Sequence, residues 1–289
     1  MWPGHGRQAV GNGERGIVID RVEINGAEAD NADLTVLARA NYAHFTSMQV
    51  RDGAVRGLDL HLTRLDESAR ELFGRGLDAE RVRGCVRHAL DGGPDAVSVR
   101  VTAFTRRLGD VLRGEPVEPD LAVATSAPAQ AQTAPVRLRA VEYERDLPHL
   151  KHAGTFGLTH RRRQAVLAGY DDALFTDRYG RISEASVSNI GFYDRERVVW
   201  PEAAMLPGIT MQLLQRGLAA KGIPSERREI RLADLVAGAS GSPDCSAFLA
   251  NSISPAVPVA SIDGTALAVD PAVTDLLVDC YETNPWQII

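Results

Sequence analysis

One segment of this 289-residue sequence lacks the apolar periodicity of either a helix or a strand. Residues 127–135 read APAQAQTAP, and a run of Ala, Gln, Thr and Pro of this kind is typical of a connecting segment. The flanking stretches are both long enough to bury a core of their own. We therefore predict a small N-terminal domain over residues 17–126, a linker over 127–135 and a larger domain over 136–289. Residues 1–16 are Gly-rich and are expected to form a flexible N-terminus. They contain no apolar core, so no secretory signal is expected there.

Strand and helix patterns alternate irregularly before the linker. Alternating apolar residues predict strands, and a 3.6-residue period predicts helices. From His61 onward, Leu62, Leu65, Ala69, Leu72 and Phe73 share one helical face, and Gly74 or Gly76 ends that helix. The predicted strands are 17–24, 43–50, 54–60, 96–104 and 121–127, and the other predicted helices are 33–40 and 79–91.

The part after the linker mixes the two patterns as well. Strands are predicted at 136–144 and 172–177, as a pair within 181–194, and as two within 246–264. Helices are predicted at 158–168, after Leu206-Pro207-Gly208, at 231–240 and at 270–283. Because the order lacks the strict alternation of a doubly wound sheet, we predict an α+β fold with two domains.

The overall charge and the cysteines narrow the functional classes. A net charge of −6 and a pI near 5.7 give no electrostatic case for nucleic acid or an anionic membrane as partner. Cys85, Cys245 and Cys280 are far apart and odd in number, which favours free thiols in a cytoplasmic protein. The seven histidines show no metal-ligand spacing, so no metal is expected.

Lysine is scarce in this chain. Lys151 and Lys221 are the only lysines among 32 basic residues. Unlike an arginine, a lysine amine can lose its proton and attack a carbonyl. Lys151 is followed by Glu184 in RISEASVSNIGFY, and an imine-forming lysine with a carboxylate for a pyridinium nitrogen are the groups that pyridoxal phosphate chemistry needs. Taken alone, however, Lys151 also fits a surface lysine.

Two further patterns suit a phosphate group. The sequence LPGIT precedes an amphipathic helix, so Gly208 would let an anion approach the first amides, those of Ile209 and Thr210. Arg64 in HLTRLDESA adds a guanidinium. A plain Pro-Gly turn and a surface charge are the alternative interpretations of these two features.

Taken together, these motifs resemble the class IV aminotransferase family over roughly residues 17–280. HLTRLDESA is similar to the H-x-x-R-L helix of the family, the segment from Lys151 to GYDDALFTD to its Schiff-base lysine and following strand, and RISEASVSNIGFY to its acid-containing signature. LPGIT and NSISPAVPV resemble its two remaining phosphate elements. The resemblance implies the two-domain fold type IV, with a small N-terminal α/β domain and a larger domain built on a mixed, barrel-like sheet.

The resemblance also implies a cofactor and roles for individual residues. Pyridoxal 5'-phosphate would be bound through Lys151 as a Schiff base, with Glu184 facing the pyridine nitrogen and Asn189 closing that motif. Its phosphate would lie against the remaining motif residues, Arg64, Ile209, Thr210 and Ser252. Arg100, in a strand of the small domain, is the candidate for the substrate carboxylate. The expected assembly is a homodimer.

The resemblance leaves two reactions open. The first is transfer of an amino group between an amino donor and a 2-keto acid. The second is elimination of pyruvate to form an aminobenzoate, as in aminodeoxychorismate lyase, because Thr46 stands where the lyase branch has a catalytic threonine and NSISPAVPV looks more like that branch. Ser98 replaces a tyrosine of the branched-chain pattern, and Gly154 and Phe156 depart from the lyase and transaminase patterns after the lysine.

Overall fold

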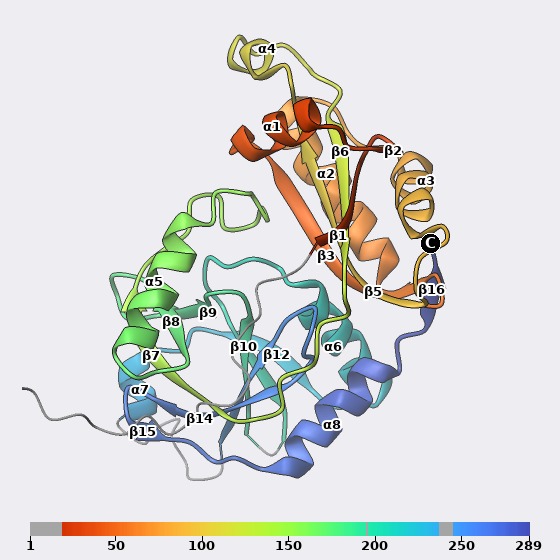
Figure 1. Cartoon of the computed structure of the whole chain (residues 1–289). Helices are drawn as coiled ribbons and strands as arrows, with labels where there is room; N and C mark the ends of the chain where they lie inside the picture. The colour runs from red at the N-terminus through yellow and green to blue at the C-terminus, as the bar shows by residue number, and fades with distance from the viewer. Residues whose placement is uncertain (1–18, 195, 237–244) are drawn as a thin grey trace, which may run out of the picture.

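The computed structural model describes residues 19–194, 196–236 and 245–289, whose strands form two sheets (Figure 1). The predicted flexible N-terminus at residues 1–16 and the end of the helix predicted at 231–240 lie outside these residues. In the part described, no helix is both long and apolar enough to cross a bilayer. All three cysteines are buried and free.

The first sheet has seven strands, and every pairing in it is antiparallel. Its order is β16-β4-β3-β5-β6-β1-β2. The strands are β1 (Ile19–Ile24), β2 (Ala27–Glu28), β3 (His44–Arg51), β4 (Ala54–Arg56), β5 (Ala96–Phe104), β6 (Asp120–Ser126) and β16 (Trp286–Ile288). The last of these comes from the far end of the chain, so the C-terminal segment completes the N-terminal sheet.

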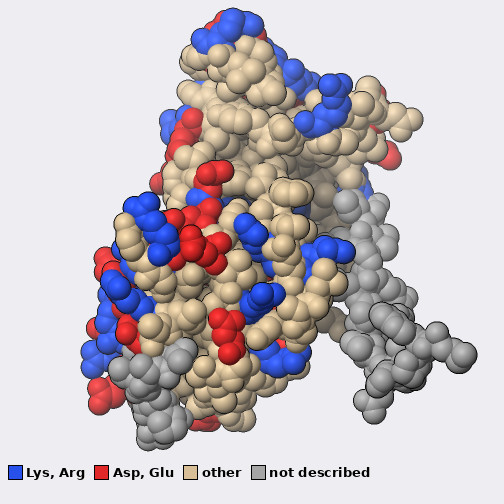
Figure 2. All heavy atoms as spheres, turned by 90° about the vertical axis from the view of Figure 1, so that its left-hand side faces the viewer, with Lys and Arg blue, Asp and Glu red and all other residues tan. Residues whose placement is uncertain are grey.

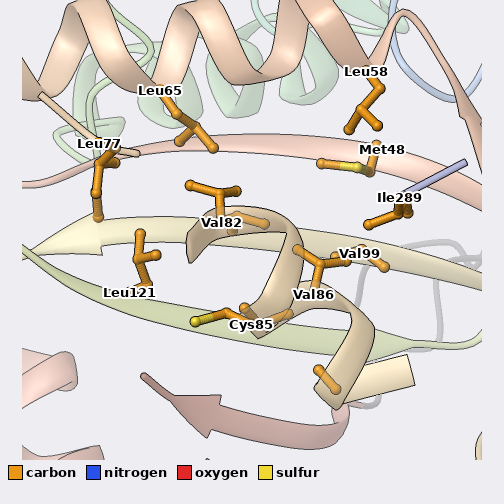
Figure 3. Packing of buried hydrophobic residues seen from close by; sticks show 14 of the residues in the cluster. Met48, Leu58, Leu65, Leu77, Val82, Cys85, Val86, Val99, Leu121 and Ile289 are labelled. Carbon is orange, nitrogen blue, oxygen red and sulfur yellow. The ribbon is translucent and has the colours of Figure 1, made fainter. Parts of the chain in front are cut away.

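Helices α2 (Leu58–Phe73) and α3 (Ala79–Leu90) pack on one face of this sheet (Figure 3). Leu65 from α2, Val86 from α3 and Val99 of β5 belong to one buried apolar cluster, and all three are at most 1% exposed. Burying such a side chain stabilises the fold by roughly 1.5–3 kcal/mol. Two shorter helices, α1 (Asn31–Arg39) and α4 (Leu108–Leu112), lie toward the top of Figure 1.

The strand predicted at 54–60 is shorter than expected. It ends at Arg56, and Gly57 has φ 72° before α2 begins at Leu58. A left-handed backbone at this point turns the chain out of the strand, a conformation that glycine adopts without steric cost. The apolar pattern at Leu58 and Leu60 therefore belongs to the first turn of the helix.

The second sheet has nine strands, six of which close into a barrel. Neighbours run in the order β10-β13-β14-β7-β8-β9, and β9 pairs with β10 again. The β14–β7 and β7–β8 pairs are parallel, while the other barrel pairs are antiparallel, so the barrel is mixed. Its strands are β7 (Val136–Glu142), β8 (Asp172–Thr176), β9 (Ile182–Ala185), β10 (Asn189–Tyr193), β13 (Ser246–Ala250) and β14 (Val257–Ile262).

Three short strands extend this barrel, and four helices accompany it. The strands β11 (Val198–Pro201), β12 (Ser225–Arg228) and β15 (Thr265–Ala266) were not predicted as separate elements. The helices are α5 (Phe156–Leu167), α6 (Ile209–Ala220), α7 (Leu232–Val236) and α8 (Pro271–Glu282). On the face shown in Figure 2, acidic and basic side chains are intermixed over the lower lobe of the molecule.

Residues 127–135 join the two sheets without forming a helix or strand. Ala129 N donates to Ser98 Oγ of the first sheet at 3.1 Å, and Gln132 N donates to Ser254 Oγ beside the barrel at 2.8 Å. The segment thus contacts both sides of the junction as it crosses. The domain boundaries at 126 and 136 stay predictions. β16 follows the second boundary in the sequence but pairs with β4 in the first sheet.

Candidate active site

A cavity of about 410 Å³ lies where the two sheets meet. Eight of the residues predicted for the site line it, namely Arg64, Arg100, Lys151, Glu184, Asn189, Ile209, Thr210 and Ser252. They come from α2, β5, the loop before α5, the β9–β10 hairpin, the start of α6 and the loop after β13. Side chains that are far apart in the sequence therefore line one cavity.

Lys151 lies in the loop between β7 and α5. Its carbonyl accepts from Phe45 N at 2.9 Å, which anchors the loop to β3. Its Nζ lies 4.9 Å from the centroid of the Phe45 ring. Burial, followed by the guanidinium groups of Arg64 and Arg145, lowers the pKa of Lys151 to about 8. About a tenth of this amine is therefore deprotonated at pH 7, far more than for an ordinary lysine, and able to act as a nucleophile or base.

Glu184 is a buried carboxyl on β9. Its Oε2 accepts from Leu206 N at 3.3 Å, and its Oε1 lies 3.5 Å from Arg145 NH1. Burial raises the pKa of Glu184 to about 7, against the opposing effects of Arg145, the Leu206 amide and Lys151. This carboxyl is poised to hold a proton-bearing cationic partner inside the cavity, because such a partner would favour its ionised form.

The start of α6 forms an anion cradle with its neighbours. Gly208 is the N-cap residue and provides no side-chain cap, so the first amides of the helix are left for another acceptor. Arg64 NH2 donates to Pro207 O at 2.5 Å, which sets its guanidinium beside this helix terminus. Burial and then Arg145 lower the pKa of Arg64 to about 10, so it remains a cation at neutral pH. Thr210 Oγ1 donates to Asn251 O at 2.8 Å, which brings the 251–253 loop and Ser252 to the same place.

Asn189 fixes the approach to that helix. Its Nδ2 donates to Leu206 O at 2.8 Å. A Cβ at Gly208 would meet Asn189 Oδ1 well inside van der Waals distance, so only glycine fits at this N-cap position. Asn189 thereby holds the 206–208 segment against the barrel, and its position at the cavity wall agrees with the predicted motif.

The outer end of the cavity is formed by the small domain. The Arg100 guanidinium lies 3.6 Å from the centroid of the Phe45 ring, which supports it on the cavity side of β5. Ser47 is paired with Arg100 across β3 and β5 and also lines the cavity. A cation and a hydroxyl thus stand together where a substrate would enter.

Thr46, predicted as a catalytic residue, lies on the opposite face of β3. Alternate residues of a strand point to opposite faces, so Phe45 and Ser47 face the cavity while Thr46 joins Met48 on the side of α2. Its Oγ1 is 2.6 Å from His61 Nδ1, and the Thr46 side chain is fully buried. Thr46 does not line the cavity, and the geometry gives it no contact with the groups that do.

Arg145 and Ser47 were missed by the sequence analysis. Arg145 was one of many arginines, and no motif or spacing marked it. The alternation of Met48 and Val50 with Ser47 and Gln49 could have assigned Ser47 to the cavity face, because Met48 and Val50 belong to the core of the small domain.

The two sheets and this cavity define a fold type IV enzyme: an antiparallel N-terminal sheet domain beside a six-stranded mixed barrel. More particularly, the chain belongs to the class IV aminotransferase family, whose sequence model, described as "Amino-transferase class IV", matches residues 43–262. This family comprises pyridoxal phosphate-dependent enzymes, and the predicted fold and family are thereby confirmed.

Solved structures share the fold at low sequence identity. The branched-chain aminotransferase of Thermoproteus uzoniensis, solved with norvaline, is 22% identical with a TM-score of 0.76, and the match covers 92% of this chain and 94% of that one. A putative 4-amino-4-deoxychorismate lyase from Legionella pneumophila is 19% identical, with a TM-score of 0.71 and coverage of 86% and 93%. A Brucella abortus aminotransferase bound to PLP is 22% identical, with a TM-score of 0.71 and coverage of 84% and 89%. No curated protein sequence matches this chain.

Proposed function

We propose that this protein is a pyridoxal phosphate-dependent aminotransferase that moves an amino group between an amino acid or amine and a 2-keto acid. The observation that carries the proposal is the placement of Lys151, Glu184 and the uncapped start of α6 around one cavity. These are an amine, an acid and an anion cradle. Pyridoxal phosphate carries an aldehyde, a ring nitrogen and a phosphate, so each group of the cofactor has a matching partner.

The donor set fits the cofactor in detail. Arg64, the amides of Ile209 and Thr210, and Ser252 would hold its phosphate. The Gly208 position, closed to any larger residue by Asn189, leaves the helix terminus accessible to an anion. The Glu184 carboxylate would accept a hydrogen bond from the ring nitrogen.

Lys151, Glu184 and Arg64 have different roles in the proposed reaction. When bound, the cofactor supplies an aldehyde carbon and a ring that accepts electrons from the substrate Cα. Lys151 would hold that carbon, and its amine is placed to take a proton from the substrate Cα and to return it. Its lowered pKa provides the unprotonated form this step needs. Glu184 would favour a protonated ring nitrogen, and Arg64 would hold the phosphate.

Arg100 supplies a site for the substrate carboxylate. Its guanidinium is held over Phe45 on the cavity wall that the first sheet contributes. A guanidinium and a carboxylate form a charge-assisted pair, and Ser47 adds a hydroxyl beside it. Amino acids and 2-keto acids both carry such a carboxylate, so one cation serves the donor and the acceptor alike.

Elimination of pyruvate from aminodeoxychorismate is the alternative reaction. The residues 251–259, which suggested it, bring Ser252 and Ile253 to the cavity wall. Thr46, the other reason for it, faces His61 instead. This placement favours the aminotransferase.

A half-reaction distinguishes the two. The protein loaded with pyridoxal phosphate is mixed with a panel of amino donors, and the cofactor spectrum is followed without acceptor. Conversion to the amine form of the cofactor, reversed by a 2-keto acid, is expected. Release of pyruvate from aminodeoxychorismate without donor conversion would instead establish the lyase.

We also propose that the protein is a homodimer. Val187 and Ile253 line the cavity, and their exposed fractions are 57% and 42%. Phe156, which follows Lys151 closely in the sequence, is 82% exposed. Apolar side chains of this size beside a polar site are suited to a second copy of the chain. Light scattering after size exclusion is expected to give twice the mass of 31.2 kDa; a single-chain mass would contradict the dimer.

A further inference from the structure

Arg145 is a buried arginine to which the proposed function gives no role. It follows β7, six positions before Lys151, and it lines the cavity. Its side chain is 8% exposed and that of Glu184 is 6% exposed. A cation is seldom buried without a partner, because desolvation costs several kcal/mol. Its contacts therefore indicate what it does.

Two contacts tie Arg145 to the site. Its NH2 donates to Leu150 O at 2.8 Å, on the residue that precedes Lys151. Its NH1 lies 3.5 Å from Glu184 Oε1. Its Nε has no hydrogen-bond partner among the residues that the structure describes. A single side chain thus bridges the lysine loop and the carboxyl on β9.

The distance to Glu184 is informative. Charge-assisted N–H···O bonds are usually about 2.7–2.9 Å long and often bidentate for arginine. Here only Oε1 faces the guanidinium, at 3.5 Å, while Oε2 accepts from Leu206 N. The arrangement keeps a positive charge beside the carboxylate without using up the acceptor capacity of Oε1.

Other groups near Glu184 do not replace this charge. Burial raises the pKa of Glu184 to about 7, and Arg145 is the largest opposing influence, ahead of the Leu206 amide and Lys151. The Leu206 amide is neutral. Lys151 has a pKa lowered to about 8, so its amine can lose its charge within the working pH range. A guanidinium keeps its charge, so Arg145 is the permanent cation at this carboxyl.

We infer that Arg145 is a positioning residue that keeps Glu184 ionised and oriented. It leaves Oε1 able to accept a hydrogen bond from the ring nitrogen of the cofactor. This role rests on the proposed function. It adds to the lysine, the acid and the phosphate cradle a fourth element, a charge that acts on the cofactor only through Glu184.

The test is the titration of Glu184 in the full-length protein, followed by infrared difference spectroscopy of its carboxyl. The signal is assigned by its loss in Glu184→Gln. Arg145→Met removes the charge at similar length, and Arg145→Gln removes it but keeps a donor for Leu150 O, in case the first variant does not fold. Arg145→Lys keeps the charge. Arg162→Met is the matched control, because Arg162 lines the same cavity and has Asp172 at 3.9 Å rather than Glu184.

Loss of the charge is expected to move the Glu184 titration upward by about 1–2 pH units in both neutral variants. Arg145→Lys and Arg162→Met are expected to stay within about half a unit of the unmodified protein. An unchanged titration in the neutral variants, or an equal shift in Arg162→Met, would overturn the role.

A second readout separates this inference from the proposed function. Pyridoxal phosphate is added to each variant, and the pH dependence of its visible spectrum is recorded. The neutral variants are expected to lose the spectral signature of the ring-protonated cofactor at lower pH than the unmodified protein. If neither the unmodified protein nor any variant binds the cofactor, the proposed function fails. The infrared titration still decides whether Arg145 controls the ionisation of Glu184.

Discussion

At the scale of single residues, the site depends on charges that burial makes effective. Lys151, Arg64 and Arg145 line one cavity, where Arg64 and Arg145 help to lower the pKa of Lys151 and Arg145 helps to lower that of Arg64. Glu184 is the carboxylate among them. In a buried cavity such charges interact more strongly than in water, so a substitution here changes the protonation of the others as well as its own contact.

Among the groups of the cofactor, Arg64 is expected to contact the phosphate. Arg64→Met should raise the Kd for pyridoxal phosphate about 10- to 100-fold, the equivalent of one charge-assisted hydrogen bond. Pyridoxal, which lacks the phosphate, serves as the matched ligand, and its Kd should change less than about 3-fold. Fluorescence titration measures both constants. An equal loss for the two ligands would show that Arg64 shapes the cavity rather than binding the phosphate.

The residues that could be predicted from the sequence share one property: each lies in a local motif. Lys151 is one of only two lysines, Glu184 lies in the RISEASVSNIGFY signature, and Gly208 precedes a predicted helix. Arg145 has no such mark, because its role comes from the approach of β9 to the lysine loop. Thr46 was assigned by likeness of position, and the two-residue period of β3 directs it to His61 instead.

At the scale of elements, the predicted types are largely those observed, and the differences lie at chain reversals and edges. The strand predicted at 54–60 is divided by the left-handed Gly57. The missed β12 reads SERR and is mostly exposed, so it has no apolar alternation to detect. Pairing with β11 makes it a strand, and pairing partners cannot be derived from local pattern alone.

Two glycines within helices test how closely the elements pack. Gly217 in α6 faces α8, where an added Cβ would overlap the backbone carbonyl of Cys280. Gly84 in α3 has open space around its Cβ position. Gly217→Ala is expected to lower the free energy of unfolding by about 2 kcal/mol or more, whereas Gly84→Ala should raise it by about 0.5–1 kcal/mol. Denaturant unfolding measures both, and an equal effect of the two substitutions would contradict this packing of α6 on α8.

At the scale of the whole molecule, the site exists because the chain crosses between two sheets. Phe45 and Arg100 come from the first sheet, while Glu184 and the α6 terminus come from the barrel side. The C-terminal β16 then follows α8 after a short connection and pairs with β4 of the first sheet (Figure 1). The sequence allowed a two-domain prediction through its linker, but this return could not be predicted, because WQI is too short to carry a pattern.

Two buried histidines in the small domain make the stability of the molecule depend on pH. Burial lowers the pKa of His44 to about 4 and that of His61 to about 3. The unfolded chain takes up a proton on each near pH 6.5, so the unfolded state binds more protons below that pH. Stability that is fully present above pH 6.5 is therefore lost as the pH falls toward 4 and 3.

Removal of one of these histidines should flatten the acid limb. Neither ring nitrogen of His44 has a hydrogen-bond partner among the described residues, and its ring lies 5.9 Å from that of Phe73. His44→Phe should therefore lose about 2–3 kcal/mol less stability than the unmodified protein between pH 6.5 and 4.5. His160→Phe, at an exposed position, is the control. Parallel acid limbs for His44→Phe and the unmodified protein would contradict a neutral buried His44.

The central claim, that Lys151 holds pyridoxal phosphate, has a direct test because the chain has only two lysines. The loaded protein is reduced with borohydride, which makes the link between the cofactor and an amine permanent, and the labelled residue is located by peptide mass spectrometry. Lys221, which lies 3.6 Å from Asp279 at the end of α6, is the internal control. The account predicts one label per chain, on Lys151, and none in Lys151→Ala. A label on Lys221, or a label that persists in Lys151→Ala, would contradict it.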